Sequence, residues 1–162
     1  MFARHPAAPA PREPFLHMPV PWVYVLGFLI GVGFQLAVPI PPTTASVAVV
    51  VSDAGGIVFV AGAILAGWGW WIFHRVRTTT VPGEASRVLV TSGPYRFTRN
   101  PMYVGLTLGY IGEAGLLVLV WPILVLALVL VYVNWFVIPV EEAGLQAFDG
   151  YAAYRARVRR WL

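Results

Sequence analysis

The chain has 162 residues, of which 59% are hydrophobic and only 11% are charged, whereas an average soluble domain carries roughly 25% charged residues. This composition excludes an ordinary soluble domain and predicts one integral membrane domain, and the absence of cysteine excludes disulfides, thiolate catalysis and cysteine-ligated metals. The net charge of +4 comes from arginine without lysine, and because no basic face exists apart from the membrane flanks, we expect no nucleic-acid partner.

The chain begins with a segment rich in proline and alanine, residues 1–21. We expect it to be a disordered lead-in rather than a signal peptide, because prolines interrupt it before any apolar stretch begins. A single membrane-embedded domain is predicted over residues 22–162. Its first two spans are predicted at Trp22–Val38 and near Ile57–Phe73. Seventeen helical residues reach about 26 Å, close to the roughly 30 Å hydrocarbon core of a bilayer.

A long apolar run, Met102–Pro139, follows in the second half of the chain. As one helix it would extend about 57 Å, which is too long for a single crossing. Trp121 and Pro122 supply an interfacial aromatic residue and a helix breaker near its middle. The run therefore predicts a tight hairpin of two spans, near Met102–Val118 and Ile123–Ile138. The expected fold is an all-α integral membrane protein with about four transmembrane helices and a C-terminal amphipathic helix.

The arginines predict the orientation of these spans. With four spans, all eleven arginines fall on the same side of the membrane, and the loops on the opposite side contain none. Cytoplasmic loops carry the excess of basic residues in membrane proteins. We therefore expect both termini, and the segments 78–103 and 140–162, to be cytoplasmic.

The first cytoplasmic segment holds polar residues directly before the third span. Gly93-Pro94 predicts a turn, and Pro101 is well placed as the first helical residue because its missing N–H costs nothing there. The start of a helix then lies beside Asn100 and Tyr103, where an anionic group such as a carboxylate is stabilised. The alternative is a membrane anchor, in which arginines meet lipid phosphates and tyrosines lie in the interface.

The second cytoplasmic segment predicts an amphipathic helix that is broken near Asp149-Gly150. Its apolar residues recur in steps of three and four, at Leu145, Phe148, Tyr151, Tyr154, Val158 and Trp161. The alternative is an interfacial helix lying on anionic lipid. Glu141 and Glu142 are unfavourable at an anionic surface unless they are paired. Arginines from Gly93–Gly105, or a cationic ligand, are the expected partners.

A few further residues have more ordinary interpretations. Gly27-x-x-x-Gly31 and Gly105-x-x-x-Gly109 predict close helix packing. Glu113, inside the third span, is predicted to be structural or interfacial, and Asn134 to form an interhelical hydrogen bond. No metal site is predicted, because the histidines lack metal-ligand spacing; they are His5, His17 and His74.

Two stretches make the sequence resemble a known family. "LVTSGPYRFTRNPMYVG", followed after the hydrophobic hairpin by "EEAGLQAFDGYAAYRARVRRWL", resembles the isoprenylcysteine carboxyl methyltransferase family and its bacterial relatives. Their superfamily also includes phospholipid methyltransferases. The resemblance covers about Thr78–Leu162, half of the chain.

The resemblance implies an enzyme of the bacterial inner membrane that uses S-adenosyl-L-methionine and methylates a lipophilic, membrane-partitioned acceptor. The cofactor-binding residues that it implies, by position, are Val88, Leu89, Val90, Tyr95, Asn100, Pro101, Met102, Tyr103 and Glu141. Val137 stands where the eukaryotic enzymes carry a substrate-side arginine, so Arg155 is the candidate to orient an anionic acceptor. Glu142 is the candidate general base for an amine acceptor.

Two other functions remain open from the sequence. One is an NADPH-dependent membrane reductase of related fold with similar C-terminal motifs. The other is a non-enzymatic membrane or lipid-binding protein that retains the fold. Binding of S-adenosylmethionine, of NADPH or of neither separates the three.

Overall fold

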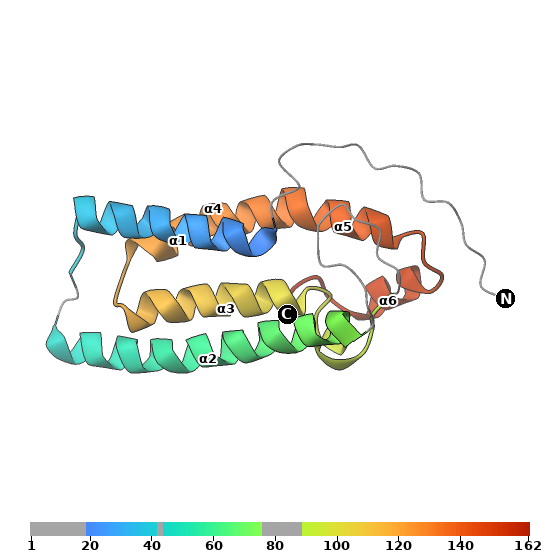
Figure 1. Ribbon diagram of the computed structural model, residues 1–162, viewed down its shortest axis with the longest axis horizontal. Helices are drawn as coiled ribbons and strands as arrows, with labels where there is room; N and C mark the ends of the chain where they lie inside the picture. The colour runs from blue at the N-terminus through green and yellow to red at the C-terminus, as the bar shows by residue number, and fades with distance from the viewer. Residues whose placement is uncertain (1–18, 42–43, 76–88) are drawn as a thin grey trace.

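The computed structural model describes residues 19–41, 44–75 and 89–162, and these ranges form a bundle of helices (Figure 1). The predicted lead-in falls almost wholly outside the described residues, as does Val88. The first helix begins at Val20, just inside the segment that was predicted as lead-in. The all-helical membrane fold expected from composition is confirmed.

Four long helices run alternately in opposite directions (Figure 1). They are α1, α2, α3 and α4, at Val20–Ala37, Ala45–Arg75, Pro101–Leu116 and Trp121–Tyr132. Helix α1 packs along α4, and α2 packs along α3. Among the described residues, three stretches are long and apolar enough to cross a membrane: α1, α2 and Trp121–Leu145. The third helix has 16 residues, or about 24 Å, so the predicted number of four spans is approximate.

Helix α2 begins at Ala45, twelve residues before the predicted start of the second span. The sequence places Ser52, Asp53 and two glycines in this stretch, which lowers its apolar character. In the structure the Ser52 hydroxyl donates to the carbonyl of Leu116 at 2.8 Å. A Cβ at Gly55 would collide with the backbone nitrogen of Leu116. Contact with α3 therefore gives Ser52 a hydrogen-bond partner and Gly55 a close packing neighbour, and the helix continues through this stretch.

Small residues bring the helices of each pair into backbone contact. A Cβ on Gly105 would lie 2.5 Å from the nitrogen of Ala66 on α2, whereas a Cβ on Gly109 would meet nothing within 4 Å. In the other pair, a Cβ on Gly27 or Gly31 would lie 2.5 Å from atoms of α4. The predicted packing role is confirmed for Gly27, Gly31 and Gly105. Gly109 has open space beside its own α-carbon, but its backbone nitrogen would lie 2.4 Å from a Cβ on Gly62 of α2, so it also lies at the close contact.

The hairpin after α3 turns where the sequence predicted it. Helix α3 ends at Leu116 and α4 begins at Trp121, with Pro122 in its first turn, where a missing N–H costs nothing. Helix α4 then passes through a π-helical turn, η3 at Val133–Val137, into α5 at Ile138–Leu145. The π-helical turn ends two residues before Pro139, near the point where a proline removes an N–H from the helix.

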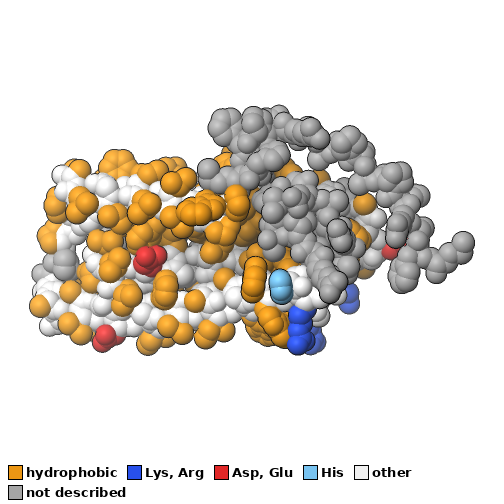
Figure 2. Space-filling view, in the orientation of Figure 1, with side chains coloured by type: hydrophobic (Ala, Val, Ile, Leu, Met, Phe, Trp, Pro, Cys, Tyr) orange, Lys and Arg blue, Asp and Glu red, His pale blue; other side chains and the backbone are white. Residues whose placement is uncertain are grey.

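The outer surface of the bundle is apolar. Figure 2 shows orange side chains along most of its length and blue cationic side chains near the C-terminal end of α2. Val50, Ile57 and Ile64 of α2 are each more than half exposed. Such side chains are stable against lipid tails but not in water. The end of the bundle near the C-terminus of α2 therefore carries charged side chains, whereas most of its remaining surface is apolar.

Candidate functional site

The two polar segments singled out in the sequence meet at one end of the bundle. That end holds a 3₁₀ turn, η2 at Gly93–Arg96, the start of α3, helix α5, and α6 at Tyr151–Arg157 (Figure 1). The first segment comes from before α3 and the second from after α4, so the hairpin between them brings both to the same place.

The turn before α3 is built by residues that fix its backbone. Gly93 has a φ of +60°, and a Cβ there would collide with Ile72. Pro94 follows it in the turn and is fully buried. Tyr95 is directed inward, with its ring centroid 5.1 Å from that of Phe73 on α2. The turn predicted from Gly93-Pro94 is confirmed, and it holds Tyr95 against the end of α2.

The hydroxyl of Tyr103 on α3 donates to Oε1 of Glu141 on α5 at 2.5 Å. This contact directly joins the two predicted cofactor-binding segments. Among the described residues, Glu141 forms no ion pair. Burial raises the pKa of Tyr95, and the nearby Tyr154 and Glu141 raise it further. Tyr95 and Tyr103 therefore both lie close to the carboxyl group of Glu141.

The other predicted cofactor residues that the structure describes flank Tyr95 and Tyr103 in the sequence and are fully or partly buried. Val90 packs with Ile72 and Tyr95, and Leu89 beside it is partly buried. Pro101 is fully buried and Met102 packs over Gly69 of α2.

Asn100 is turned toward the C-terminal end of the chain. Its Nδ2 donates to the carbonyl of Arg160 at 2.9 Å. Among the described residues, no side-chain capping bond reaches the first turn of α3. The start of α3 thus keeps N–H groups that an external anion can use.

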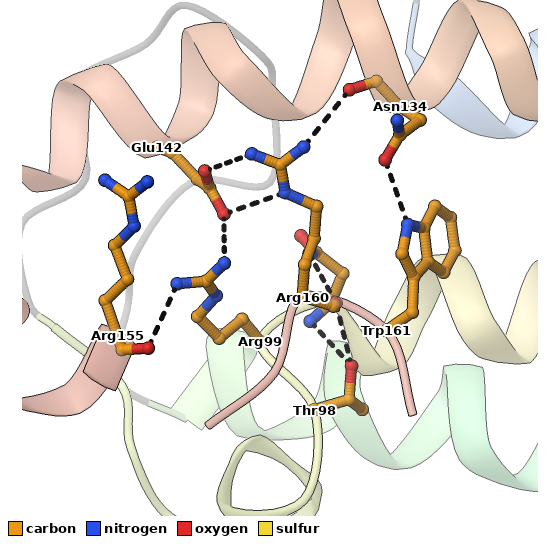
Figure 3. Close-up of polar contacts among 8 residues, drawn as sticks. Thr98, Arg99, Asn134, Glu142, Arg155, Arg160 and Trp161 are labelled. Atoms are coloured by element: carbon orange, nitrogen blue, oxygen red, sulfur yellow. Dashed lines mark hydrogen bonds and ion pairs between the residues drawn. The ribbon is translucent and has the colours of Figure 1, made fainter. Parts of the chain in front are cut away.

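Glu142 lies at the centre of an ion-pair cluster (Figure 3). Its residue is 7% exposed. Oε1 is 3.0 Å from Nη2 of Arg99, and Oε2 is 2.6 Å from Nη2 of Arg160. The prediction that an arginine of Gly93–Gly105 pairs with the two glutamates is confirmed for Glu142, which pairs with Arg99, whereas the partner of Glu141 is Tyr103. Arg160 was missed, because the end of the chain was expected to continue as a helix.

The predicted C-terminal helix is interrupted and then ends early. Gly150, with a φ of +87°, precedes α6, which confirms the predicted break. Helix α6 ends at Arg157, so the prediction that Val158 and Trp161 belong to its apolar face is wrong. Residues 158–161, which we name the C-terminal strap, run beside the loop that precedes α3.

The C-terminal strap replaces helical hydrogen bonds with bonds to other elements. The Arg99 amide donates to the Arg159 carbonyl at 2.9 Å, and the buried Thr98 hydroxyl donates to the Arg160 carbonyl at 3.1 Å. The Trp161 indole donates to Oδ1 of Asn134 at 3.0 Å (Figure 3). Asn134 does form a long-range hydrogen bond, but its partner is the strap and not a second span.

Helix α6 connects the second segment to the first. The Tyr154 hydroxyl donates to the Tyr95 carbonyl at 2.8 Å, and burial raises the pKa of Tyr154 to about 12. Arg155 is exposed, and within the described ranges its guanidinium has no hydrogen bond or ion pair. Figure 3 shows this guanidinium extending toward the helix that carries Glu142. Glu142 and Arg155, the two predicted acceptor-side residues, are therefore brought to one face of the site.

A separate groove of about 460 Å³ lies at the other end of α2. It is lined mainly by α2 residues, among them Asp53 and Ile57, with Leu116 of α3. It is not part of the polar cluster.

Comparison with known families gives a match over residues 50–148 to the family described as phospholipid methyltransferase. The matched region runs from early α2 through α5 and includes Tyr95, Tyr103, Glu141 and Glu142. Neither the curated proteins nor the solved structures gave a match. Because the match covers more than half of the chain and the helices can span a membrane, the protein belongs to the phospholipid methyltransferase family of membrane methyltransferases.

Proposed function

We propose that the protein transfers a methyl group from S-adenosyl-L-methionine to a lipophilic acceptor that enters from the bilayer. The observation that carries this proposal is the 2.5 Å hydrogen bond between Tyr103 and Glu141. It joins the two segments that the family resemblance implies as the cofactor site, in a chain that belongs to a methyltransferase family.

The residues at this end fit the charges of the cofactor. Glu141 is a carboxylate without an ion pair among the described residues, so it is available to a cationic ligand. The start of α3 has no side-chain cap in the described part of the chain, so its N–H groups can serve a carboxylate. Tyr95 supplies an aromatic ring near Glu141. S-adenosylmethionine carries two cationic groups, an ammonium and a sulfonium, and one carboxylate.

When bound, the cofactor supplies a methyl group that its positively charged sulfur already activates. The task of the protein is then mostly to align the reactants and exclude water. We assign charge compensation to Glu141, carboxylate binding to the first turn of α3, and cation–π or packing contacts to Tyr95 and Tyr103. Leu89, Val90, Pro101 and Met102 would form the apolar surroundings of this group.

Glu142 is better suited to positioning than to proton abstraction in this arrangement. Both of its oxygens are engaged by the guanidinium groups of Arg99 and Arg160. A general base for an amine acceptor would first have to release one of them. We therefore propose that Glu142 holds the two arginines, while Arg155, which is exposed, orients an anionic acceptor.

We also propose that this end of the bundle faces the cytoplasm of a bacterial cell, with both chain termini on that side. The arginines support this orientation, because those in the described residues lie at the polar end or flank it.

Cofactor binding tests the proposed function most directly. Purified protein in detergent is titrated with S-adenosylhomocysteine and, separately, with NADPH by calorimetry. We expect binding of the first and none of the second. Binding of NADPH would support a reductase instead, and binding of neither would support a non-enzymatic role. Transfer from methyl-labelled cofactor to prenylcysteine analogues, long-chain acids, thiols and phosphatidylethanolamine then identifies the acceptor class.

A further inference from the structure

Asn100 lies at the N-cap of α3, a position where an asparagine normally bonds to its own helix. The side-chain oxygen of such an asparagine accepts a hydrogen bond from an N–H of the first turn, which stabilises the helix. Among the described residues this bond is not formed. Instead, Nδ2 of Asn100 donates to the carbonyl of Arg160 in the C-terminal strap at 2.9 Å. A side chain well suited to cap α3 is therefore held away from it.

Thr98 and the strap fix Asn100 in this orientation. The Thr98 hydroxyl donates to the same Arg160 carbonyl at 3.1 Å, and it accepts from the Asn100 amide at 3.2 Å. Together with the bond from Nδ2 of Asn100, these contacts form a closed ring of three hydrogen bonds. Thr98 is 1% exposed, so its hydroxyl is shielded from competing water. A turn of the Asn100 side chain toward the helix would break this ring.

The Arg160 carbonyl is held in place by contacts of the strap with α5 and η3. The Arg160 guanidinium contacts the Glu142 carboxylate of α5 at 2.6 Å and 3.2 Å. The indole of the next residue, Trp161, donates to Oδ1 of Asn134 in η3 at 3.0 Å (Figure 3). The strap is thus anchored on the second segment of the site and presents one carbonyl group to Asn100 of the first segment.

We infer that the C-terminal strap is a positioning element, which keeps Asn100 from capping α3 and so leaves the first-turn N–H groups free for the carboxylate of the cofactor. Pro101 has no N–H, and the Val104 amide donates to the Asn100 carbonyl at 3.0 Å. The amides of Met102 and Tyr103 lie between them, and they are the groups that an Asn100 cap would occupy. The inference rests on the proposed function, because it concerns binding of the same cofactor.

A side-chain cap and a ligand carboxylate would compete for these N–H groups. An N-cap bond of asparagine favours the helix by an amount that changes an equilibrium constant about fivefold. If the Asn100 side chain were released from the strap, it would therefore weaken binding of a carboxylate by about this factor. A ligand without a carboxylate would not be affected. This difference distinguishes a positioning role from a structural one, because damage to the fold would weaken the binding of both ligands.

Two substitutions of Asn100 in the full-length protein test this role. Asn100→Ser introduces a side chain that caps helices well but lacks the amide that bonds to Arg160, whereas Asn100→Ala can form neither bond. Each variant in detergent is titrated by calorimetry with S-adenosylhomocysteine and with its decarboxylated analogue. We expect Asn100→Ser to bind S-adenosylhomocysteine about fivefold more weakly than Asn100→Ala, and both to bind the analogue equally. Equal affinity of the two variants for S-adenosylhomocysteine, or the same difference with the analogue, would overturn the inference.

Loosening of the strap gives a second test. Arg160→Gln combined with Trp161→Phe removes the side-chain bonds to α5 and η3 that anchor the strap. This protein should bind S-adenosylhomocysteine about threefold to fivefold more weakly. Addition of Asn100→Ala should then raise the affinity, because it removes the competing cap, and an unchanged or further weakened affinity would contradict the inference. Arg159→Gln, which alters an exposed side chain of the same strap, is the matched control and should leave affinity unchanged.

The parent protein distinguishes failure of this inference from failure of the proposed function. Binding of S-adenosylhomocysteine to the parent, without a difference between Asn100→Ser and Asn100→Ala, would refute the role of the strap and leave the proposed function intact. Absence of binding to the parent would refute the proposed function, and the positioning role would be refuted with it.

Discussion

Glu142 on α5 and Arg160 in the C-terminal strap are joined by two contacts. Oε2 accepts from Nη2 at 2.6 Å, and Oε1 accepts from Nε at 3.2 Å. Arg99, from the loop before α3, pairs with the same carboxylate. The buried Glu142 side chain therefore connects the C-terminal strap to the loop before α3. We expect these ion pairs to stabilise the fold in addition to shaping the site.

We expect Arg160→Gln to lower the free energy of unfolding by about 2 kcal/mol. Loss of one partner from a fully buried ion pair costs roughly 3 to 5 kcal/mol, and the Arg160 side chain is 29% exposed, which reduces the effect. The measurement is thermal or denaturant unfolding in detergent.

The neighbouring Arg159→Gln is the control for this substitution. Arg159 is exposed and contributes to the strap through its backbone, so its side chain should be dispensable. Equal stability of the Arg159 and Arg160 variants would contradict the role given to the ion pair.

The Tyr103–Glu141 contact leads to a prediction about cofactor affinity. Glu141→Gln removes a charge that would face a cationic ligand, so we expect S-adenosylhomocysteine to bind about 10- to 150-fold more weakly. Tyr103→Phe leaves the carboxylate but removes its hydrogen bond, and a loss of roughly twofold to tenfold is expected. Calorimetric titration of each purified variant measures both effects.

Tyr110→Phe is the matched control for these two variants. Tyr110 lies on the same helix and is equally buried, but its hydroxyl has no partner among the described residues. Its loss should not change affinity. If Glu141→Gln binds as tightly as Tyr110→Phe, the assignment of Glu141 to the cofactor fails.

The spacing of apolar residues, together with the prolines and glycines at turns, predicted much of this fold. The hairpin at Trp121–Pro122, the turn at Gly93-Pro94 and the break at Gly150 are all fixed by local backbone chemistry, which a sequence displays directly. The ion pair of Arg99 with Glu142 was also foreseeable, because few cations could reach that carboxylate.

Features that depend on distant contacts were not predicted. Helix α2 extends past Asp53 because α3 supplies partners for Ser52 and Gly55. The last residues leave the helix because Thr98, Arg99 and Glu142 offer bonds that helical geometry would not. The spacing of apolar residues depends only on the neighbouring sequence and cannot reveal such distant partners. The spacing at Val158 and Trp161 therefore predicted a helix where the strap lies.

The seam between α2 and α3 predicts opposite effects for two glycines of α3. Gly112→Ala would place a Cβ against the backbone nitrogen of Phe59, and separating the helices to relieve this should cost about 1 to 3 kcal/mol. Gly109→Ala meets nothing within 4 Å and should be neutral or stabilising by up to about 1 kcal/mol, since alanine favours helix. Unfolding of both variants under identical detergent conditions measures the difference; a Gly112→Ala protein as stable as Gly109→Ala would contradict the backbone contact.

The orientation of the bundle is tested by reporters placed in its connections. The loops between α1 and α2 and between α3 and α4 lie at the same end (Figure 1), opposite the Glu142 cluster. The positive-inside bias puts arginine-bearing segments in the cytoplasm, so reporters after Pro42 and after Trp121 should report the external side. A fusion after Leu162 should report the cytoplasm. Because helix α3 has only 16 residues, the Trp121 fusion is the decisive one: a cytoplasmic signal there would mean that α3 and α4 do not form a spanning hairpin. The membrane would then not hold the two site segments on one side, and the hairpin would not explain the contact between Tyr103 and Glu141.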